Sequence, residues 1–345
     1  MISFLRPAIV LMGYARLRAE DRAVDLASGF ADHRANQLSS NPDHLRRLIR
    51  AYRKAKDTPA PLRGIWAEWI ATNYRPLISA LETENLTELA TLLENHCREQ
   101  FAVGTGGYDA FIRYHSLLGP QYIKFMWASY RDILGHSDVR CPVIGNPTGV
   151  KINDCVISVE TLRYAYHARE MARVLKPGDY VVEIGGGLGG VCYQVLQLAD
   201  CKYSIYDIPE VAVLSGYFLL HALPAKRVKL YGEEGDFDVA VLPHFAIDEL
   251  PDLSVDLFFN SCSFSEMDAK DSSAYLRLIE RAGRGYFMHD NHENRFVFGG
   301  AEPSVNRIGS EMVPQNFRSV YKRPRAHVLP EDRSIVHFEY LYERQ

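Results

Sequence analysis

The stretch that decides the fold is Val181-Val182-Glu183-Ile184-Gly185-Gly186-Gly187-Leu188-Gly189-Gly190. It begins as an apolar run with one carboxylate and continues into six positions, five of which are glycine. This pattern predicts a strand that breaks into a tight turn before a helix, because glycine adopts positive φ and carries no side chain that would keep a ligand from the backbone N–H groups. The sequence therefore predicts a nucleotide-binding loop at 185–190.

The residues on both sides of this loop alternate between short apolar runs and helical stretches. The predicted strands are 180–184, 203–206, 239–242, 255–260 and 285–288, and the helices between them are 191–198, 209–221 and 270–282. Ser158 is the predicted N-cap of an earlier helix that runs to about Leu175. The alternating segments 317–322 and 335–342 predict an antiparallel pair at one edge. The fold class is therefore α/β, a Rossmann-like sheet of parallel strands with a terminal antiparallel pair.

The first part of the chain predicts helices with no evident chemistry. Asn41-Pro42-Asp43 is a helix start, and two further helices are expected at 65–80 and 86–96, after a break at Thr58-Pro59-Ala60-Pro61. We divide the chain into a helical N-terminal cap or oligomerisation region at 1–140 and a ligand-binding domain at 141–345. The cap could join copies into a homo-oligomer. The helix that starts at Asn41-Pro42-Asp43 carries an arginine face, formed by Arg46, Arg47, Arg50 and Arg53. This face is either a solvated surface or a site for an acidic partner.

An aromatic-rich stretch follows the flexible segment Gly104-Thr105-Gly106-Gly107. Its large side chains could form flat walls for a substrate ring, although core packing is the more common fate of such residues. They are Tyr108, Phe111, Tyr114, Tyr122, Phe125, Trp127 and Tyr130. Beyond them, 145–149 has the composition of a loop.

Composition excludes several classes of partner. Of 345 residues, 47% are hydrophobic, which provides a substantial core, and the net charge of −4 with intermixed signs argues against nucleic acid or an anionic membrane as partner. The six cysteines are scattered without a C-x-x-C pair, so we expect reduced thiols in a cytoplasmic protein rather than a metal site or disulfides. The apolar segment 2–12 lacks a signal-peptide pattern, and no stretch is long enough to span a bilayer.

The spacing Gly185-x-Gly187-x-x-Gly190 fits two kinds of cofactor, a dinucleotide and S-adenosylmethionine. In both cases Asp207, at the end of the second strand, would bind a ribose. Glu183 favours S-adenosylmethionine, because a carboxylate there would oppose a pyrophosphate but suit an ammonium and a sulfonium. About 155 residues follow the loop, which leaves little room for a second mononucleotide-binding half. An NAD(P)-dependent oxidoreductase remains the second interpretation, and a glycine turn without a ligand the third.

Three blocks of sequence also carry a resemblance. They are 183–190, Tyr206-Asp207-Ile208-Pro209-Glu210, and Asn260-Ser261-Cys262-Ser263-Phe264-Ser265-Glu266-Met267. Over roughly 140–295 the chain resembles the sugar O-methyltransferase family of class I S-adenosylmethionine-dependent methyltransferases. The resemblance implies a class I methyltransferase sheet and transfer of a methyl group to a hydroxyl of a sugar or glycosylated natural product. A non-catalytic methyltransferase-like binding protein is a further alternative.

The resemblance implies that the cofactor lies across the carboxyl ends of the first three strands. Glu183 and the glycine backbone would hold the methionine part, and Asp207 both ribose hydroxyls. Arg163 would pair with the methionine carboxylate unless it is a surface residue. The full set of expected cofactor-binding residues is Glu183, Gly185, Gly187, Gly189, Asp207, Ile208, His244, Phe245, Asn260, Ser261 and Arg163.

Methyl transfer to a hydroxyl also needs a base near the methyl group. Residues after the fourth and fifth strands are in range, and we favour Glu266 and His292, with His289 and Asp290 also near. Alternatively, Glu266 is a first-turn helix carboxylate and His292 a solvated loop residue. Glu266, Asp290 and Glu293 could collect a Mg²⁺ ion, but their spacing does not indicate such a site.

Overall fold

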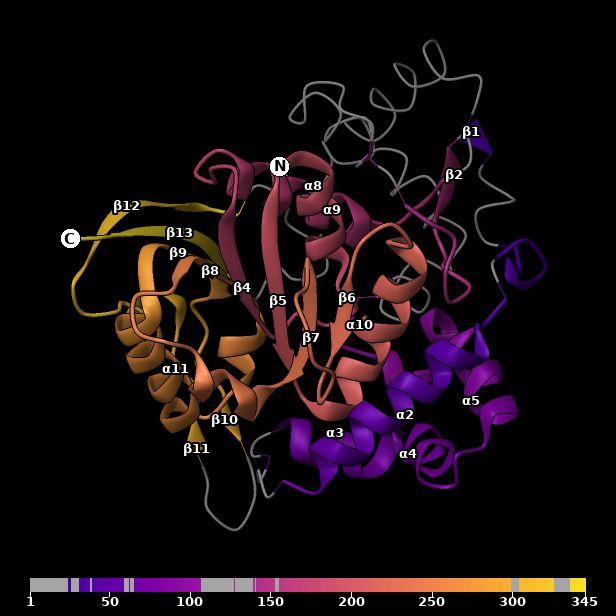
Figure 1. Ribbon diagram of the computed structural model, residues 1–345. Helices are drawn as coiled ribbons and strands as arrows, with labels where there is room; N and C mark the ends of the chain where they lie inside the picture. Colours follow the sequence, from indigo (N-terminus) through magenta and orange to yellow (C-terminus); the bar gives the residue numbers. More distant parts are fainter. Residues whose placement is uncertain are drawn as a thin grey trace, which may run out of the picture.

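The computed structural model describes residues 24–25, 31–37, 39–58, 62, 65–106, 127, 139, 141–152, 155–298, 304–325 and 336–345 (Figure 1). The apolar segment 2–12, the break at 59–61 and the aromatic stretch 108–130, apart from Trp127, lie outside these residues. Trp127 is buried, which agrees with core packing at that position. No helix in the described part of the chain combines the length and apolar character needed to cross a bilayer.

An eight-stranded sheet forms the centre of the molecule, in the order β12-β13-β9-β8-β4-β5-β7-β6 (Figure 1). All neighbouring strands pair in parallel except at β13, which is antiparallel to both β12 and β9. The strands are β4 (Asp179–Ile184), β5 (Cys201–Asp207), β6 (Val228–Leu230), β7 (Val239–Pro243), β8 (Val255–Ser261), β9 (Gly283–His292), β12 (Phe317–Pro324) and β13 (His337–Arg344). The predicted Rossmann-like α/β fold with a terminal antiparallel pair is confirmed. The short edge strand β6 was not predicted.

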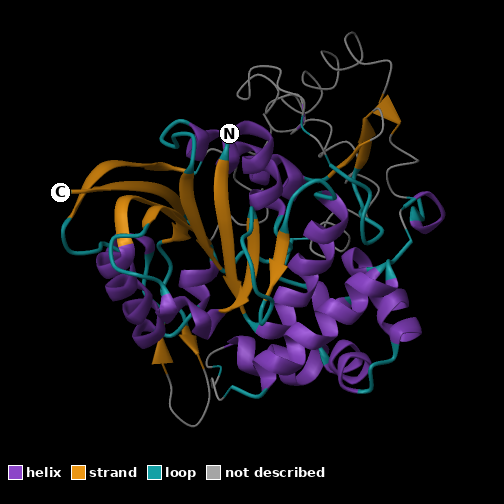
Figure 2. Cartoon of the chain, in the orientation of Figure 1, coloured by secondary structure: helices purple, strands orange, loops and turns teal. Residues whose placement is uncertain are grey.

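Side chains that alternate along the strands build a core on each face of the sheet. Val181 points into the core beneath α8 (Val159–Ala172), α9 (Gly190–Leu198) and α10 (Pro209–Ala222), whereas Val182 and Ile184 point into the core beneath α11 (Ala269–Ala282) and the 3-10 helix η5 (His244–Glu249). Figure 2 shows these helices on both sides of the sheet. The strand order reverses between β4 and β8, and in such sheets ligands bind at that switch point.

The N-terminal helices pack against this domain as one layer. They are α2 (Pro42–Lys56), α3 (Ile65–Asn73), α4 (Arg75–Glu82) and α5 (Leu86–Leu93). The Asn41 side chain caps α2 as expected, and Leu45, Leu48 and Ile49 on α2 join the core that α10 also lines. The predicted helix at 65–80 is two helices, because Pro76 in the first turn of α4 cannot donate a backbone hydrogen bond to the preceding turn. The chain therefore bends at Tyr74.

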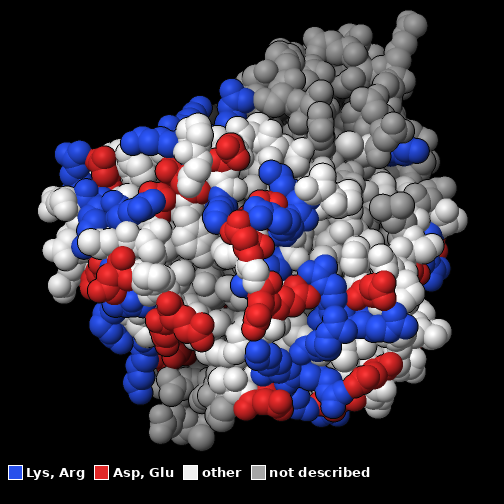
Figure 3. Space-filling view, in the orientation of Figure 1, with Lys and Arg blue, Asp and Glu red and all other residues white. Residues whose placement is uncertain are grey.

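The arginine face of α2 has partners within the chain. Arg47 binds the carboxylate of Glu233 at 2.7 Å, Arg46 pairs with Asp43, and Arg53 pairs with Glu84. On the face shown in Figure 3, acidic and basic side chains are interspersed, and neither sign forms a continuous field. The structure therefore explains much of this arginine face by contacts inside the molecule. Whether the cap joins copies of the chain stays a prediction.

The remaining elements are small. Two short sheets are formed by β1 (Val24–Asp25), β2 (Val150–Ile152) and β3 (Cys155–Ile157), and by β10 (Val297–Phe298) and β11 (Ser304–Val305). The 3-10 helices are η2 (Arg34–Asn36), η3 (His96–Arg98), η4 (Gln100–Ala102), η6 (Ser263–Glu266) and η7 (Gly309–Glu311). Ser158 caps α8 through a full capping box with Thr161, as predicted, and α8 ends at Ala172 rather than at Leu175.

Candidate functional site

The glycine loop has the backbone that its sequence predicts. Gly185, Gly187 and Gly189 have φ of +74°, +55° and +86°, which residues with a side chain adopt only at a cost. A Cβ at Gly185 would also lie 2.6 Å from the Cβ of Ser263. The loop therefore needs glycine both for its turn and for close approach to the end of β8.

A cavity of about 400 Å³ opens beside this loop, at the switch point between β4 and β8. Its walls come from the loop, the carboxyl ends of β5 and β8, the segment η5, helix α11 and the N-terminal helices. Glu183, Gly185, Gly187, Asp207, Ile208, His244, Phe245, Ser261, Arg163 and Glu266 all line it, so the fold brings these predicted residues together in one place.

Glu183 lies buried beneath the loop, where it is 2% exposed. The Tyr203 hydroxyl donates a hydrogen bond to its carboxylate at 3.0 Å. Burial raises the pKa of Glu183 to about 8, and the nearby Asp207 carboxylate adds to the rise, while the Tyr203 bond opposes it. A bound cation would reverse this shift, so the carboxylate is suited to a positively charged ligand group.

Asp207 ends β5 and is held by the backbone on both of its oxygens. The Gly187 N–H donates to Oδ2 at 2.8 Å, and the Ile208 N–H donates to Oδ1 at 2.7 Å. Burial raises the pKa of Asp207 to about 7 in spite of these two bonds. Each carboxylate oxygen has a second lone pair that can accept from a ligand hydroxyl. The carboxylate is thus fixed in one orientation before a ligand arrives.

His244 and Phe245 begin η5 and pack edge to face, 5.5 Å between ring centroids. His244 is partly buried, and its Nδ1 has no hydrogen-bond partner among the described residues. Burial lowers the pKa of His244, so the neutral ring offers one donor and one acceptor at the cavity wall. Across the cavity, Arg163 on α8 is mostly buried and pairs with Glu160 at 2.6 Å. The surface alternative for Arg163 is therefore excluded.

Two expected cofactor residues have structural contacts instead. Asn260 is fully buried, donates to the Ile184 carbonyl at 2.8 Å and accepts from the Asn291 side chain at 2.8 Å. It ties β8 to β4 and β9 and does not line the cavity. Gly189 is the N-cap of α9, and a Cβ there would press on Leu219 of α10. Both residues support the structure of the glycine loop without lining the cavity.

Glu266 ends η6 on the cavity wall, and a residue of the N-terminal cap holds it. The indole N–H of Trp66, on α3, donates to Glu266 Oε2 at 3.0 Å. Thr105, also from the first part of the chain, accepts a hydrogen bond from the Leu188 N–H of the glycine loop at 3.2 Å. Sequence reasoning missed both contributions, because residues so distant along the chain give no local signal of their contact.

The two predicted histidine bases do not reach the cavity. The fifth strand was expected to end at Met288, but β9 continues to His292 and pairs with β13 along its length. His289 is fully buried and stacks on Tyr340 at 4.5 Å between centroids. Burial lowers the pKa of His289 to about 3 and that of His292 to about 4. The solvated-loop alternative for His292 is equally wrong, since its ring is buried.

The residues suggested as Mg²⁺ ligands bind other side chains of the protein instead. Asp290 pairs with Arg325 at 2.6 Å, and Glu293 accepts hydrogen bonds from Ser310 and Tyr340. The part of the chain that the structure describes contains no group of three histidine, cysteine or acidic side chains placed to hold a metal ion. The residues present do not fit a Mg²⁺ site.

No family model matches the chain, and no curated protein matches it. Among proteins of known structure, it is similar to mitomycin 7-O-methyltransferase, with 14% identity and a TM-score of 0.36 over 54% of this chain and 55% of that one. It is also similar to geranyl diphosphate methyltransferase in complex with GPP and sinefungin, with 13% identity and a TM-score of 0.39 over 55% of this chain and 80% of that one. A third similar structure is an S-adenosylmethionine-dependent methyltransferase from Mesorhizobium loti, with 15% identity and a TM-score of 0.36 over 52% of this chain and 96% of that one. At such identities the likeness concerns the Rossmann-like fold alone.

Proposed function

We propose that the protein is an S-adenosylmethionine-dependent O-methyltransferase. The observation that carries the proposal is the buried carboxylate of Glu183 beneath the glycine loop, together with Asp207 at the end of the next strand. A pyrophosphate on the loop would meet the Glu183 carboxylate, whereas an ammonium and a sulfonium would be attracted to it, and Asp207 would bind a ribose in either case. This charge arrangement favours S-adenosylmethionine over NAD(P).

The residues present fit this cofactor. Glu183 would bind its ammonium group, Arg163 its carboxylate, and Asp207 its ribose hydroxyls. Ile208 and Phe245 offer apolar surface for the adenine, and His244 offers a polar edge. When bound, S-adenosylmethionine supplies an electrophilic methyl group. The work left to the protein is to place an acceptor hydroxyl in line with that methyl and to take its proton.

We assign Glu266 as the general base that takes the proton of the acceptor hydroxyl. It lines the cavity at the carboxyl end of β8, and the indole N–H of Trp66 donates to its Oε2 and holds the side chain at the cavity wall. A carboxylate so held can accept the hydroxyl proton as the methyl group is transferred. Neither His289 nor His292 lines this cavity, so we do not retain them as bases.

We propose a sugar or glycoside as the acceptor. The resemblance of 260–267 to sugar O-methyltransferases supports this, and so does the composition of the remaining wall. Trp66 and Tyr275 provide aromatic surface there, and Asp271 and Glu266 provide carboxylates that can accept from several hydroxyls. The combination suits a ring with many hydroxyl groups.

Binding of S-adenosylhomocysteine and of NAD, measured by calorimetry on the full chain, tests the cofactor. We expect S-adenosylhomocysteine to bind and to raise the melting temperature, because it binds only the folded state. Glu183→Gln should weaken this binding, while Glu249→Gln, at an exposed carboxylate on η5 outside the cavity, should not. Binding of NAD alone would refute the proposal.

Transfer of a labelled methyl group to a panel of nucleotide-linked sugars and glycosides tests the reaction. Product analysis should place the label on oxygen. Glu266→Gln should lower the rate by roughly 10²-fold or more, the usual contribution of a positioned general base, with little change in S-adenosylhomocysteine affinity. Full activity of Glu266→Gln would refute the base assignment, and cofactor binding without transfer to any acceptor would favour a non-catalytic binding protein.

A further inference from the structure

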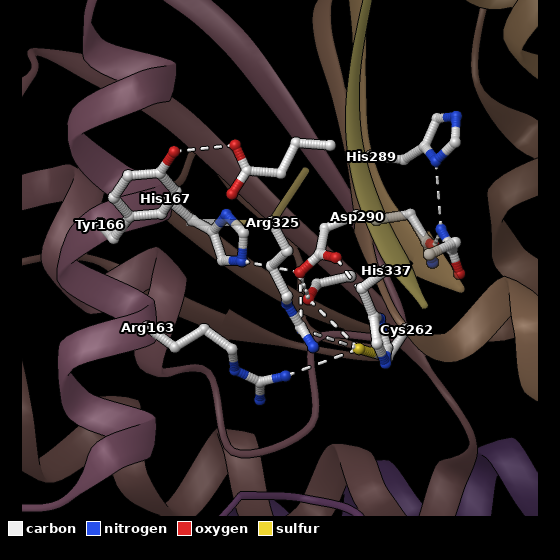
Figure 4. A network of polar contacts seen from close by, with 12 residues as sticks. Arg163, Tyr166, His167, Cys262, His289, Asp290, Arg325 and His337 are labelled. Carbon is white, nitrogen blue, oxygen red and sulfur yellow. Dashed lines mark hydrogen bonds and ion pairs between the residues drawn. The ribbon is translucent and has the colours of Figure 1, made fainter. Parts of the chain in front are cut away.

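Behind the cavity lies a buried cluster of charged side chains from four parts of the fold (Figure 4). Asp290 on β9 is at its centre. Arg325, directly after β12, pairs with Asp290 at 2.6 Å, and His167 on α8 approaches the same carboxylate at 3.3 Å. His337 at the start of β13 lies 3.7 Å from its other oxygen. The proposed reaction uses none of these groups.

Cys262 connects this cluster to the cavity. It follows β8, and its sulfur lies 3.2 Å from Arg325 Nη2 and 3.7 Å from Arg163 Nη1. Cys262 also lines the cavity wall. Its backbone has φ of +66°, which is rare for a residue with a side chain, and its N–H is fixed by the Asp290 carbonyl at 2.7 Å. The sulfur is therefore held between two guanidinium groups at a surface that a ligand can reach.

The cations around the sulfur outnumber its acidic neighbours. Arg163, which pairs with Glu160, approaches it from α8, Asp290 from β9, Arg325 from the end of β12 and His337 from β13. Arg325 is 8% exposed, and its Nε has no hydrogen-bond partner among the described residues while Nη2 is directed at the sulfur. Burial alone would raise the pKa of Cys262, but Arg325, His337 and Arg163 together lower it to about 6.

We propose that Cys262 is held as a thiolate at the cavity wall and is the site at which the protein reacts with small alkylating electrophiles. In the reaction with iodoacetamide, the sulfur forms a bond to the CH₂ carbon while the carbon–iodine bond breaks and iodide leaves with the electron pair. No base is needed, because the thiol proton has already passed to solvent. The proposal concerns the thiol and does not depend on which cofactor the cavity binds.

The pH dependence of alkylation, rather than its rate, is the decisive measurement. A thiolate of low pKa is more abundant at neutral pH but intrinsically less nucleophilic, so the two effects partly cancel in the rate at one pH. Mass spectrometry of peptides after timed labelling of the folded chain gives a profile for each cysteine. For Cys262 we expect a midpoint roughly 2 to 3 pH units below that of an ordinary thiol. Cys155, which is also partly exposed, serves as an internal control, whereas burial raises the pKa of Cys141 and its labelling should need a higher pH.

Two substitutions on α8 distinguish the effect of a nearby cation on Cys262 from a general disturbance of the helix. Arg163→Gln should raise the Cys262 midpoint by roughly one pH unit, because it removes one of the cations near the sulfur. Arg173→Gln, at the exposed end of α8, should leave it unchanged. Arg163→Lys, which keeps the charge, should restore most of the shift. A Cys262 midpoint equal to that of Cys155, or no labelling of Cys262 in the folded chain, would overturn the proposal.

Discussion

Single residues decide what the cavity can bind, and the two carboxylates on its wall are in an unusual state. Burial raises the pKa values of Glu183 and Asp207 to about 8 and about 7. At neutral pH the empty site therefore holds protons that ordinary carboxylates would have released. A ligand that needs the charged forms must displace these protons, so its affinity depends on pH.

We expect S-adenosylhomocysteine to bind more tightly at pH 8 than at pH 6, by roughly tenfold or more. The sign follows from linkage: the free site is the more protonated state, so binding releases protons and is favoured as the pH rises. Calorimetry in two buffers of different ionisation heat counts the released protons. Glu183→Gln should remove much of the dependence, and equal affinity at both pH values would contradict the assigned role of these carboxylates.

Trp66 is expected to position the proposed base. Trp66→Phe keeps an aromatic ring but removes the N–H that holds Glu266, so kcat should fall roughly tenfold, as expected for one bond to a charged group. Trp69→Phe is a matched control on the same helix, since the Trp69 N–H has no hydrogen-bond partner among the described residues. A shifted pH profile in Trp66→Phe alone would support the role. Identical kinetics in the two variants would contradict it.

At the residue scale, the sequence could predict those site residues that stand near the carboxyl end of a strand, either within its last residues or shortly after it. Glu183, Asp207 and Glu266 belong to this group. His289 and His292 were misplaced because β9 extends beyond its apolar run: pairing with β13 satisfies the backbone of residues whose side chains are polar. Cys262 was within a recognised block, but its charged neighbours come from helix α8 and from segments near the end of the chain, so its environment could not be anticipated.

Among the elements, the contact between α8 and α9 sets the back wall of the cavity. Gly190, the first residue of α9, lies against the ring of Tyr164 on α8, and a Cβ there would be 2.2 Å from the ring. Tyr164 lines the cavity, and its hydroxyl donates to the Thr105 carbonyl at 3.4 Å. The absence of one methyl group thus allows both helices and the first part of the chain to meet at the loop.

Gly190→Ala should destabilise the protein by about 1 to 3 kcal/mol, the usual cost of overpacking. Urea denaturation with and without S-adenosylhomocysteine would measure both the stability and the integrity of the cavity. Tyr164→Ala alone should also destabilise, by leaving a void. In the double variant the new methyl group occupies vacated space, so the combined loss should be smaller than the sum of the two. Strict additivity would show that the two residues do not press on each other.

Across the whole molecule, the helical cap and the Rossmann-like domain meet around buried histidines. His96 follows α5 and is fully buried beneath Gly145, with its Nδ1 2.7 Å from the Leu93 carbonyl. Its ring contacts Tyr217 of α10 edge to face. Burial lowers the pKa of His96 to about 4, although its bond to the Leu93 carbonyl opposes this. The neutral ring is therefore part of the junction.

We expect acid to weaken this junction. Because the folded pKa of His96 lies below the unfolded value of about 6.5, its contribution to stability is present above pH 6.5 and is lost as the pH falls toward 4, on the order of 3 kcal/mol in all. Urea denaturation at pH 7.5, 6.5 and 5.5 would follow the loss. His96→Gln should be less stable than the wild type at pH 7.5 but should lose less on acidification. Parallel curves would contradict this.

The contribution of His337 to stability has the opposite pH dependence to that of His96. Burial disfavours its charge, but its bonds to Asp290 and Cys262 raise its pKa to about 9. Its contribution is therefore fully present below pH 6.5 and is lost as the pH rises through 9. The stability difference between the wild type and His337→Gln should grow from pH 9 to pH 6.5, while the difference for His96→Gln shrinks from pH 7.5 to pH 5.5.

Most of the sheet could be predicted from the sequence, because each buried parallel strand is a continuous apolar run between turn signals. The antiparallel pair at the edge also followed from the alternation in 317–322 and 335–342. The seating of the cap could not be predicted. Its apolar stripe is visible in Leu45, Leu48 and Ile49, but a stripe does not name its partner, which proved to be α10.

The contact between α2 and α10 has a consequence for the order in which the protein is made. Arg47, on α2, and its partner Glu233, which lies beyond the end of α10, are 186 residues apart along the chain. At the usual rate of synthesis, about 5 to 20 residues per second, the cap helices leave the ribosome on the order of ten seconds or more before the helix that covers them exists. During this interval the apolar side of α2 is exposed, so a nascent chain that stalls before α10 presents a surface that chaperones recognise.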